Sequence, residues 1–450
     1  MSIEASPDVI HTHQLNYKPI QEANCKYRFI RIPLNNVTSS SVTVGASSSQ
    51  LLEWKLPNAV YNLAQSYITY NETMANSTPL LNGYLEDTVG LASNIYFGNA
   101  SGADLCNLNY GNKYIKIARK LSTPLNEYLT NDYDTSLLYP CNTAAASNLF
   151  TSTATTNTTT AGTTAFIEPK YIAINPNTGA YERDRQFQLG SIPDTIFSVD
   201  KDIYIPTDMF IRITAGPANS YTYTVTAASV ADPSHNSQAT AVDVTLTNVY
   251  LYLAVETNQL IIDSVISKVR SSGLTMNIPY TTGFRNSSTG IVGNINVPLS
   301  SQYGKKMKQI LTTVWNGTET GFTCGDSSNA SGRKIASYNT FLNNRQLQDT
   351  SIDCTIANVH DWRENARHVL GSVIQNRTMY GLNWFHLDKF YEDNKGSIVP
   401  EENRQDGYDM NQGPVLYQLQ ATTANGTWIY YQFCSFSRDV VLNNQGFMYV

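Results

Sequence analysis

The alternation of apolar and polar residues changes phase within residues 242–280, and the chain is organised around this stretch. Its first part alternates as a half-buried strand does. The phase then slips by one residue around Asn248, which predicts a β-bulge or a strand that changes sheets. The apolar residues before the slip are Val242, Val244 and Leu246, and those after it are Val249, Leu251, Leu253 and Val255.

The same stretch then changes to a helical period. Asn258 suits an N-cap, Gly273 suits the position after the last turn, and a new strand begins at Leu274. Because a β region ends before this helix and another begins after it, the helix is predicted to join two β domains. Its apolar stripe consists of Ile261, Ile262, Val265, Ile266 and Val269.

Short apolar or alternating segments separated by turn residues fill both halves of the chain. This spacing predicts an all-β protein of sandwich or jelly-roll type, with short helices in its connections. Strands are predicted in the first half at 26–34, 42–44, 51–56, 60–70, 166–174, 195–205, 209–214 and 221–230. In the second half they are predicted at 274–281, 291–297, 335–338, 352–356, 382–390, 415–421, 427–436 and 440–442, while 305–315 fits a strand or a helix and 361–373 a helix.

Two segments fit no β domain. Residues 1–24 carry two prolines and little periodicity, so we expect an N-terminal arm. The uncharged run within 130–165 has too few large apolar residues to form a core, so we expect a long exposed loop. The apolar C-terminal residues are expected to dock. The predicted division is an arm at 1–24, a first β domain at 25–257, a linker helix at 258–273 and a second β domain at 274–450.

The composition indicates a protein surface suited to extensive contact with other protein chains. Charged residues are 15% of the chain, against about 25% in an average protein, and tyrosines number 29. Surfaces rich in Thr, Asn and Tyr lose water more cheaply than charged ones. The net charge of −6 predicts no direct sequence-specific binding of nucleic acid. The sequence shows no secretory signal, and its six cysteines are scattered, so we expect reduced thiols and no secretion.

Candidate chemistry is sparse. No nucleophile, metalloprotease, phosphate-binding or dinucleotide motif is present, so no catalytic, cofactor-binding or metal residue is assigned. Three pairs are weak candidates: His11 and His13 lack further metal ligands, His386 and Asp388 are read as a structural hydrogen bond, and Asp406 and Asp409 are read as a turn. Basic residues at 113, 116, 119 and 120 are read as a solvated face. Ten glycosylation-type sequons, read as chance, begin at Asn36, Asn71, Asn76, Asn99, Asn157, Asn286, Asn316, Asn329, Asn376 and Asn425.

Several segments resemble a known family. RFIRIPL, followed by LLEWKLPNAVYNLAQSYITY, is similar to the start of the first domain in the double jelly-roll major capsid proteins of double-stranded DNA viruses, of polinton-like virus and virophage type. VYLYLAVETNQLI resembles the end of that domain, and LTMNIPY the start of the second. Residues resembling its later parts are SYNTFLNNRQLQD, HDWRENARHVLGSVI and YGLNWFHLDKF.

This resemblance, of the adenovirus–tectivirus lineage, implies more than the residues show by themselves. It implies two consecutive jelly-roll β-sandwiches, a homotrimer of pseudo-hexagonal outline and an icosahedral shell tiled by such trimers in the virion. Its implied partners are neighbouring capsomers, penton proteins and minor capsid proteins. Two other classes stay open: a secreted adhesin or lectin-like protein, and a carbohydrate-active enzyme, which would need a cleft with paired carboxylates.

Overall fold

The fold is seen in a computed structural model. No helix in its described part is long and apolar enough to span a membrane. The residues that it describes are 10–11, 27–37, 41–45, 47–75, 82–85, 91–115, 172–173, 180–218, 222–225, 243–289, 293–299, 306–316, 335–342, 344–346, 350–353, 385–389, 408–409, 413–421 and 427–449.

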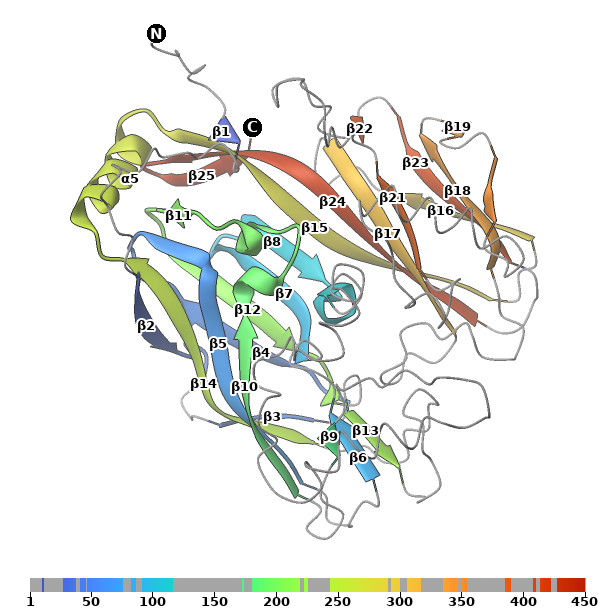
Figure 1. Ribbon diagram of the computed structural model, residues 1–450, viewed down its shortest axis with the longest axis horizontal. Coiled ribbons are helices and arrows are strands. Elements are labelled where there is room, and N and C mark those ends of the chain that lie inside the picture. Colours follow the sequence, from blue (N-terminus) through green and yellow to red (C-terminus); the bar gives the residue numbers. More distant parts are fainter. Residues whose placement is uncertain are drawn as a thin grey trace, which may run out of the picture.

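The first half forms a β-sandwich of two main sheets (Figure 1). One sheet has the order β10 (Ala180–Gln188), β5 (Tyr61–Ala75), β14 (Val244–Glu256) and β2 (Tyr27–Pro33), with β11 (Asp202–Ile203) on β5 and β3 (Ser41–Val44) on β14. The other has the order β4 (Gln50–Lys55), β12 (Met209–Ala215), β7 (Ala92–Asn99) and β8 (Asp104–Asn109). A small third sheet contains β13 (Thr222–Val225), β6 (Asn82–Leu85) and β9 (Ile172–Ala173).

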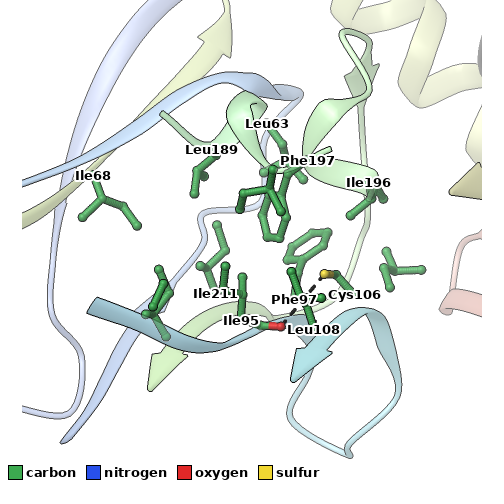
Figure 2. Close-up of a cluster of buried hydrophobic side chains, with 14 of the residues drawn as sticks. Leu63, Ile68, Ile95, Phe97, Cys106, Leu108, Leu189, Ile196, Phe197 and Ile211 are labelled. Atoms are coloured by element: carbon green, nitrogen blue, oxygen red, sulfur yellow. Dashed lines mark hydrogen bonds between the residues drawn. The ribbon is translucent and has the colours of Figure 1, made fainter. Parts of the chain in front are cut away.

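Apolar side chains from both main sheets meet between them (Figure 2). Ile68 of β5 lies on one side, and Ile95 and Phe97 of β7 lie on the other. Two short 3-10 helices, η3 (Leu189–Ser191) and η4 (Ile196–Ser198), close one end, where Phe197 packs on Phe97 with ring centroids 5.8 Å apart. This core explains why residues alternate along the flanking strands.

The predicted phase slip is a β-bulge in β14. Asn248 is exposed, has a φ of 53°, and lies where the register with β5 shifts between Thr247 and Tyr250. Asn tolerates this left-handed conformation better than most residues. Before the bulge β14 pairs with β3, and after it with β2, so the bulge separates two edge partners. The prediction for Val255 was wrong: a second register shift between Tyr252 and Ala254 turns it partly outward.

The predicted linker helix is confirmed as α5 (Gln259–Ser271). The Asn258 side chain caps it by accepting a hydrogen bond from the Leu260 amide at 3.0 Å. Gly273 follows with a φ of 73°, which only glycine adopts freely. Val265 and Val269 are buried against the core, so the polar face points to solvent.

The second half forms another sandwich. Its larger sheet has the order β1 (Ile10–His11), β15 (Leu274–Thr289), β24 (Thr427–Asn443), β17 (Lys306–Asn316) and β21 (Phe385–Lys389), with β25 (Gly446–Tyr449) on β24 and β22 (Tyr408–Asp409) on β17. The facing sheet has the order β16 (Gly293–Leu299), β23 (Val415–Ala421), β18 (Ile335–Leu342) and β19 (Arg345–Gln346), with β20 (Ile352–Asp353) on β18. Between them lie Tyr280, Met307, Ile310, Val415, Cys434 and Phe436.

Strand β24 is central, as its apolar sequence predicted. Residues 431–437 are all buried rather than alternating, because the second sandwich covers one face and the first sandwich the other. Figure 1 shows β15 and β24 running side by side from the α5 end into the second sandwich. The predicted strands at 427–436 and 440–442 are therefore one element.

Other predictions were incomplete. The strand expected at 195–205 is mainly η4 and the short β11, because the hydroxyls of Thr195 and Ser198 bond to backbone carbonyls three residues earlier and stabilise turns. The missed strands include β7, β8 and the highly charged β10, and segment 305–315 is strand β17. The expected helix at 361–373, the loop at 130–165 and most of the arm at 1–24 lie outside the described residues.

Candidate functional site: the junction between the two sandwiches

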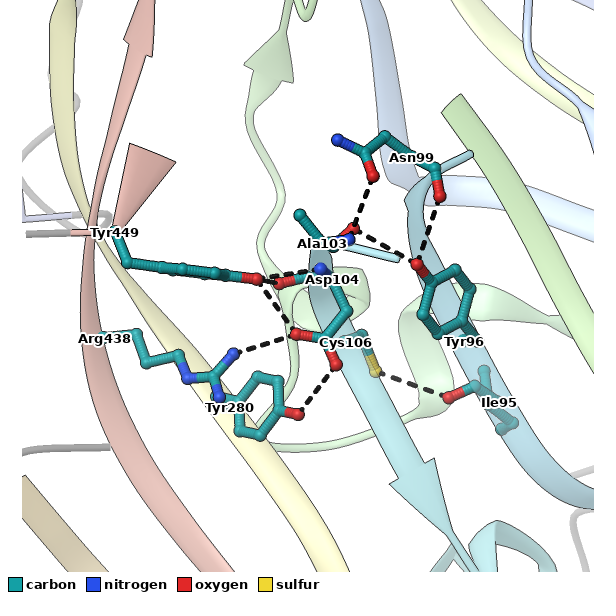
Figure 3. A network of polar contacts seen from close by, with 9 residues as sticks. All are labelled: Ile95, Tyr96, Asn99, Ala103, Asp104, Cys106, Tyr280, Arg438 and Tyr449. Carbon is teal, nitrogen blue, oxygen red and sulfur yellow. Dashed lines mark hydrogen bonds and ion pairs between the residues drawn. The ribbon is translucent and has the colours of Figure 1, made fainter. Parts of the chain in front are cut away.

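The two sandwiches meet at a polar junction centred on Asp104 (Figure 3). Asp104 begins β8 of the first sandwich and is followed there by the buried residues Leu105 and Cys106. Its partners come from β15, β24 and β25 of the second sandwich, far away in the sequence. The junction is therefore formed by the tertiary fold rather than by a local motif.

Every polar group of Asp104 in this network contacts the second sandwich. Its carboxylate pairs with Arg438 Nη1 at 3.1 Å, and the two side chains are 16% and 14% exposed. The Tyr280 hydroxyl donates to the other carboxylate oxygen, also at 3.1 Å. The Tyr449 hydroxyl accepts from the Asp104 amide at 2.8 Å, donates to its carboxylate at 3.0 Å and contacts its carbonyl oxygen. Asp104 therefore connects β8 to three strands of the second sandwich, β15, β24 and β25.

Two tyrosine rings enclose the Arg438 guanidinium. Its central carbon lies 3.4 Å from the Tyr280 ring centroid and 5.1 Å from that of Tyr449. Such cation–π contacts strengthen when water is excluded. Burial, more than the nearby Asp104 charge, raises the pKa of both tyrosine hydroxyls above their usual range, so they stay protonated as hydrogen-bond donors.

A second polar contact surrounds Asp194, in the turn between η3 and η4. Its carboxylate accepts from the Tyr114 hydroxyl at 2.9 Å and from Gln309 Nε2 at 2.8 Å. Its carbonyl accepts from the Thr281 hydroxyl at 2.6 Å. Asp194 has a φ of 50°, a strained conformation that the surrounding contacts maintain. This turn therefore binds β15 and β17 to the first sandwich.

A third set of contacts between the two sandwiches involves aromatic rings. Lys113 donates to the Tyr431 hydroxyl at 2.8 Å and lies 4.0 Å from its ring centroid. The ring of Tyr110, a residue with a φ of 57°, meets Tyr431 edge-on at 5.0 Å. Tyr114 packs against Phe433 at 5.2 Å. Lys113, predicted to lie on a solvated face, instead contacts the second sandwich; Lys116, Arg119 and Lys120 lie outside the described residues.

Backbones also approach closely here. A Cβ at Gly283 of β15 would lie 2.3 Å from the Asn109 carbonyl oxygen of β8 and 2.9 Å from the Phe433 ring. Real Cβ atoms do not come so close to backbone, so glycine is required for this contact. The two sandwiches thus touch through backbone as well as side chains.

This arrangement connects the two sandwiches through an ion pair, hydrogen bonds and aromatic contacts. Among the described residues, no three His, Cys, Asp or Glu side chains lie close enough to hold a metal ion. His11 lies on β1, His386 and Asp388 lie on β21, and Asp409 lies on β22; His13 and Asp406 lie outside the described part. His11, His386, Asp388 and Asp409 therefore belong to no wider group of metal ligands within the described part of the chain.

Two of the sequons have occupied amide nitrogens. Asn36 Nδ2 donates to the Leu51 carbonyl at 2.7 Å, and Asn286 Nδ2 lies 3.5 Å from Gln432 Oε1. Asn99 uses its side-chain oxygen to accept from the Ala103 amide at 3.0 Å. These asparagines make structural contacts of their own.

The architecture is similar to that of solved virus capsid proteins. No family model and no curated protein matches this chain. Among solved structures, the PBCV-1 virus capsid matches 95% of this chain and 97% of its own, with a TM-score of 0.50 and 8% identity. PBCV-1 VP54, fitted into a reconstruction of the virophage Sputnik, gives the same values. The Sputnik virophage structure at 3.5 Å covers 94% of this chain and 88% of its own at 11% identity, with a TM-score of 0.48.

This chain has the double jelly-roll fold. The PBCV-1 proteins it matches are double jelly-roll major capsid proteins, and the match runs through both sandwiches. The expected fold class is therefore confirmed. The first sandwich is accordingly the first jelly roll, and the second sandwich is the second jelly roll.

The sequence did not reveal the junction. Asp104 and Tyr449 lie on β8 and β25, where no strand was predicted, and Arg438 lies between the predicted strands 427–436 and 440–442. A weak indication was available: Asp104 is the only charged residue of β8, and a charge that is largely buried needs a partner. Pairing the two across more than three hundred residues requires the fold.

Proposed function

We propose that this chain is a viral major capsid protein, a structural subunit of the virion shell. The observation that carries the proposal is a fold match along nearly the whole length of the PBCV-1 capsid protein, covering 95% of this chain. The junction supports it, because a shell subunit must transmit force between its domains without hinging. The proposal assigns no catalytic activity, cofactor or metal.

The proposed assembly is a homotrimer. Each chain supplies two jelly rolls, so three chains supply six and give a pseudo-hexagonal outline that tiles an icosahedral shell. The low charge of 15% and the 29 tyrosines suit such burial between copies. In this proposal the partners are neighbouring capsomers, penton proteins and minor capsid proteins, and synthesis occurs in the host cytoplasm or nucleus.

The proposed division of the chain follows the sequence. Residues 25–257 form the first jelly roll, 258–273 the linker, and 274–450 the second jelly roll. The 130–165 loop is proposed to lie at the outer end of the trimer. Residues 1–24 are proposed as an arm that contacts other parts of the assembly; within the described residues, Ile10 and His11 pair in parallel with Met276 and Asn277 of the same chain.

Electron microscopy of the purified chain tests the capsid proposal. We expect capsomers of pseudo-hexagonal outline in negative stain, and sheets or closed particles at higher concentration. As a matched pair, Asp104→Asn should lower the yield of intact capsomers because it weakens the junction, whereas Asp208→Asn, at an exposed site, should not. Featureless monomers from the native chain would contradict a capsid role.

A further inference from the structure

A buried carboxylate ends β14, immediately before α5. Glu256 is 2% exposed. Its Oε1 accepts hydrogen bonds from the amides of Thr257 and Asn258, at 2.8 and 2.7 Å, and so shapes the turn into the helix. Its Oε2 is buried and has no hydrogen-bond partner among the described residues. A buried acceptor without a partner is costly.

A second carboxyl group, that of Asp202 in β11, is linked to Glu256 through a single residue. Tyr27 connects the two: it is opposite Glu256 in the β2–β14 register, and its hydroxyl donates to Asp202 Oδ1 at 3.0 Å. Asn62 of β5 donates to the Tyr27 oxygen at 3.0 Å and to Asp200 at 2.9 Å. Four strands and the start of α5 therefore converge on this carboxyl pair.

The surroundings of Asp202 favour its neutral form. Burial is the largest influence and raises the pKa of Asp202 to about 6; the hydrogen bond from Tyr27 lowers it, the charges of Glu256 and Asp200 raise it, and Lys201 lowers it. These are the titratable groups that act on Asp202 from β2, β14 and its own segment. The two carboxylates repel one another when both are charged.

We propose that Asp202 and Glu256 act as a carboxyl pair that holds one proton in the folded protein and thereby stabilises the turn from β14 into α5. With the proton on Asp202, the repulsion between its carboxyl group and that of Glu256 is absent. Release of the proton to solvent leaves two carboxylates at the connection between the jelly rolls. The turn from β14 into α5 is therefore more stable in mild acid than at neutral pH.

The direction of the pH effect follows from the two pKa values of Asp202. The pKa is about 6 in the folded protein and 3.8 in its ordinary state, so folding takes up a proton between these values. The added stability is fully present below pH 3.8 and is lost as the pH rises through about 6. Between pH 5 and pH 7.5 the folding equilibrium constant should fall about tenfold through this group.

Urea unfolding of the purified full chain tests the proposal, with the native protein, Asp202→Asn and Asp208→Asn compared at about pH 5 and about pH 7.5. Asparagine mimics the protonated carboxyl. We expect Asp202→Asn to be more stable than the native chain at the higher pH, and the ratio of the two folding constants to change about tenfold between the two values. Asp208→Asn should follow the native chain. A ratio that does not change would overturn the proposal.

Two further measurements keep the test decisive. In the native chain, hydrogen exchange of residues 259–271, corrected for intrinsic rates, should show greater protection at the lower pH; equal protection would contradict the proposal. The same unfolding is repeated with EDTA and with calcium at the higher pH. A calcium-dependent gain in the native chain that Asp202→Asn abolishes would show a cation site rather than a proton-holding pair.

Discussion

At the scale of single residues, burial decides which charges matter. The pair Asp104–Arg438 is largely buried, shares two tyrosines and crosses between the jelly rolls. The pair Lys55–Asp208 is shorter, at 2.6 Å, but its side chains are 47% and 65% exposed. Solvent screens the exposed pair and not the buried one, so the longer pair contributes more.

Asp104→Asn should therefore destabilise the chain by about 1–3 kcal/mol, since it leaves Arg438 without its counter-charge in a site poor in water. Asp208→Asn removes a charge of the same kind from the exposed pair and should change stability by less than about 1 kcal/mol. Equilibrium urea unfolding measures both. Equal effects would mean that the junction does not stabilise the fold.

The two described cysteines should be unreactive in the native protein. Cys106 and Cys434 are free and buried, and burial raises the pKa of both thiols above the usual range, which lowers the thiolate population. Iodoacetamide should label neither residue before unfolding and both afterwards, without reductant, as read by peptide mass spectrometry. Labelling of Cys106 in the native state would show that the region beside the junction opens. Labelling of Cys434 would show that the core of the second sandwich opens.

At the scale of elements, the accuracy of prediction followed the environment of each strand. Strand β14 was predicted well, bulge included, because one face is buried and the other is solvated, which leaves a period of two. Strand β10 was missed because its charges hide its burial: Arg185 is fully inside, paired with Glu72 at 2.7 Å. A sequence shows the charge of Arg185 but not the partner that permits its burial.

The bulge gives a prediction at this scale. Asn248→Val places a branched side chain at a φ of 53° and should destabilise the chain by about 1–2 kcal/mol. Asn248→Gly, which tolerates that backbone, should be within about 0.5 kcal/mol of the native protein. Thermal unfolding followed by circular dichroism separates them. Equal stability of the two variants would mean that β14 passes Asn248 without a bulge.

At the scale of the whole molecule, the sequence predicted two β domains and the helix between them, because α5 and the strands beside it carry clear periods. It did not predict how the domains meet. The junction depends on contacts such as Gly283 with Asn109, where a strand of one jelly roll passes close to a strand of the other. Such an approach leaves no periodic pattern in the sequence, since it depends on a single missing side chain.

Gly283→Ala should therefore weaken the contact between the jelly rolls. The added Cβ would lie 2.3 Å from the Asn109 carbonyl oxygen, so β8 and β15 must separate, at a cost of roughly 1–3 kcal/mol. Ser287→Ala on the same strand, at an exposed position, is the matched control and should be close to neutral. Limited proteolysis between the jelly rolls should become faster in Gly283→Ala alone; unchanged cleavage would show that the junction accommodates a Cβ.

The central claim is that this double jelly roll is a capsid subunit that assembles in threes. The most direct test is the mass of the purified native chain by light scattering coupled to size-exclusion chromatography at micromolar concentration. The account predicts a single species of about three times 49.9 kDa. A stable monomer of 49.9 kDa under the same conditions would contradict it.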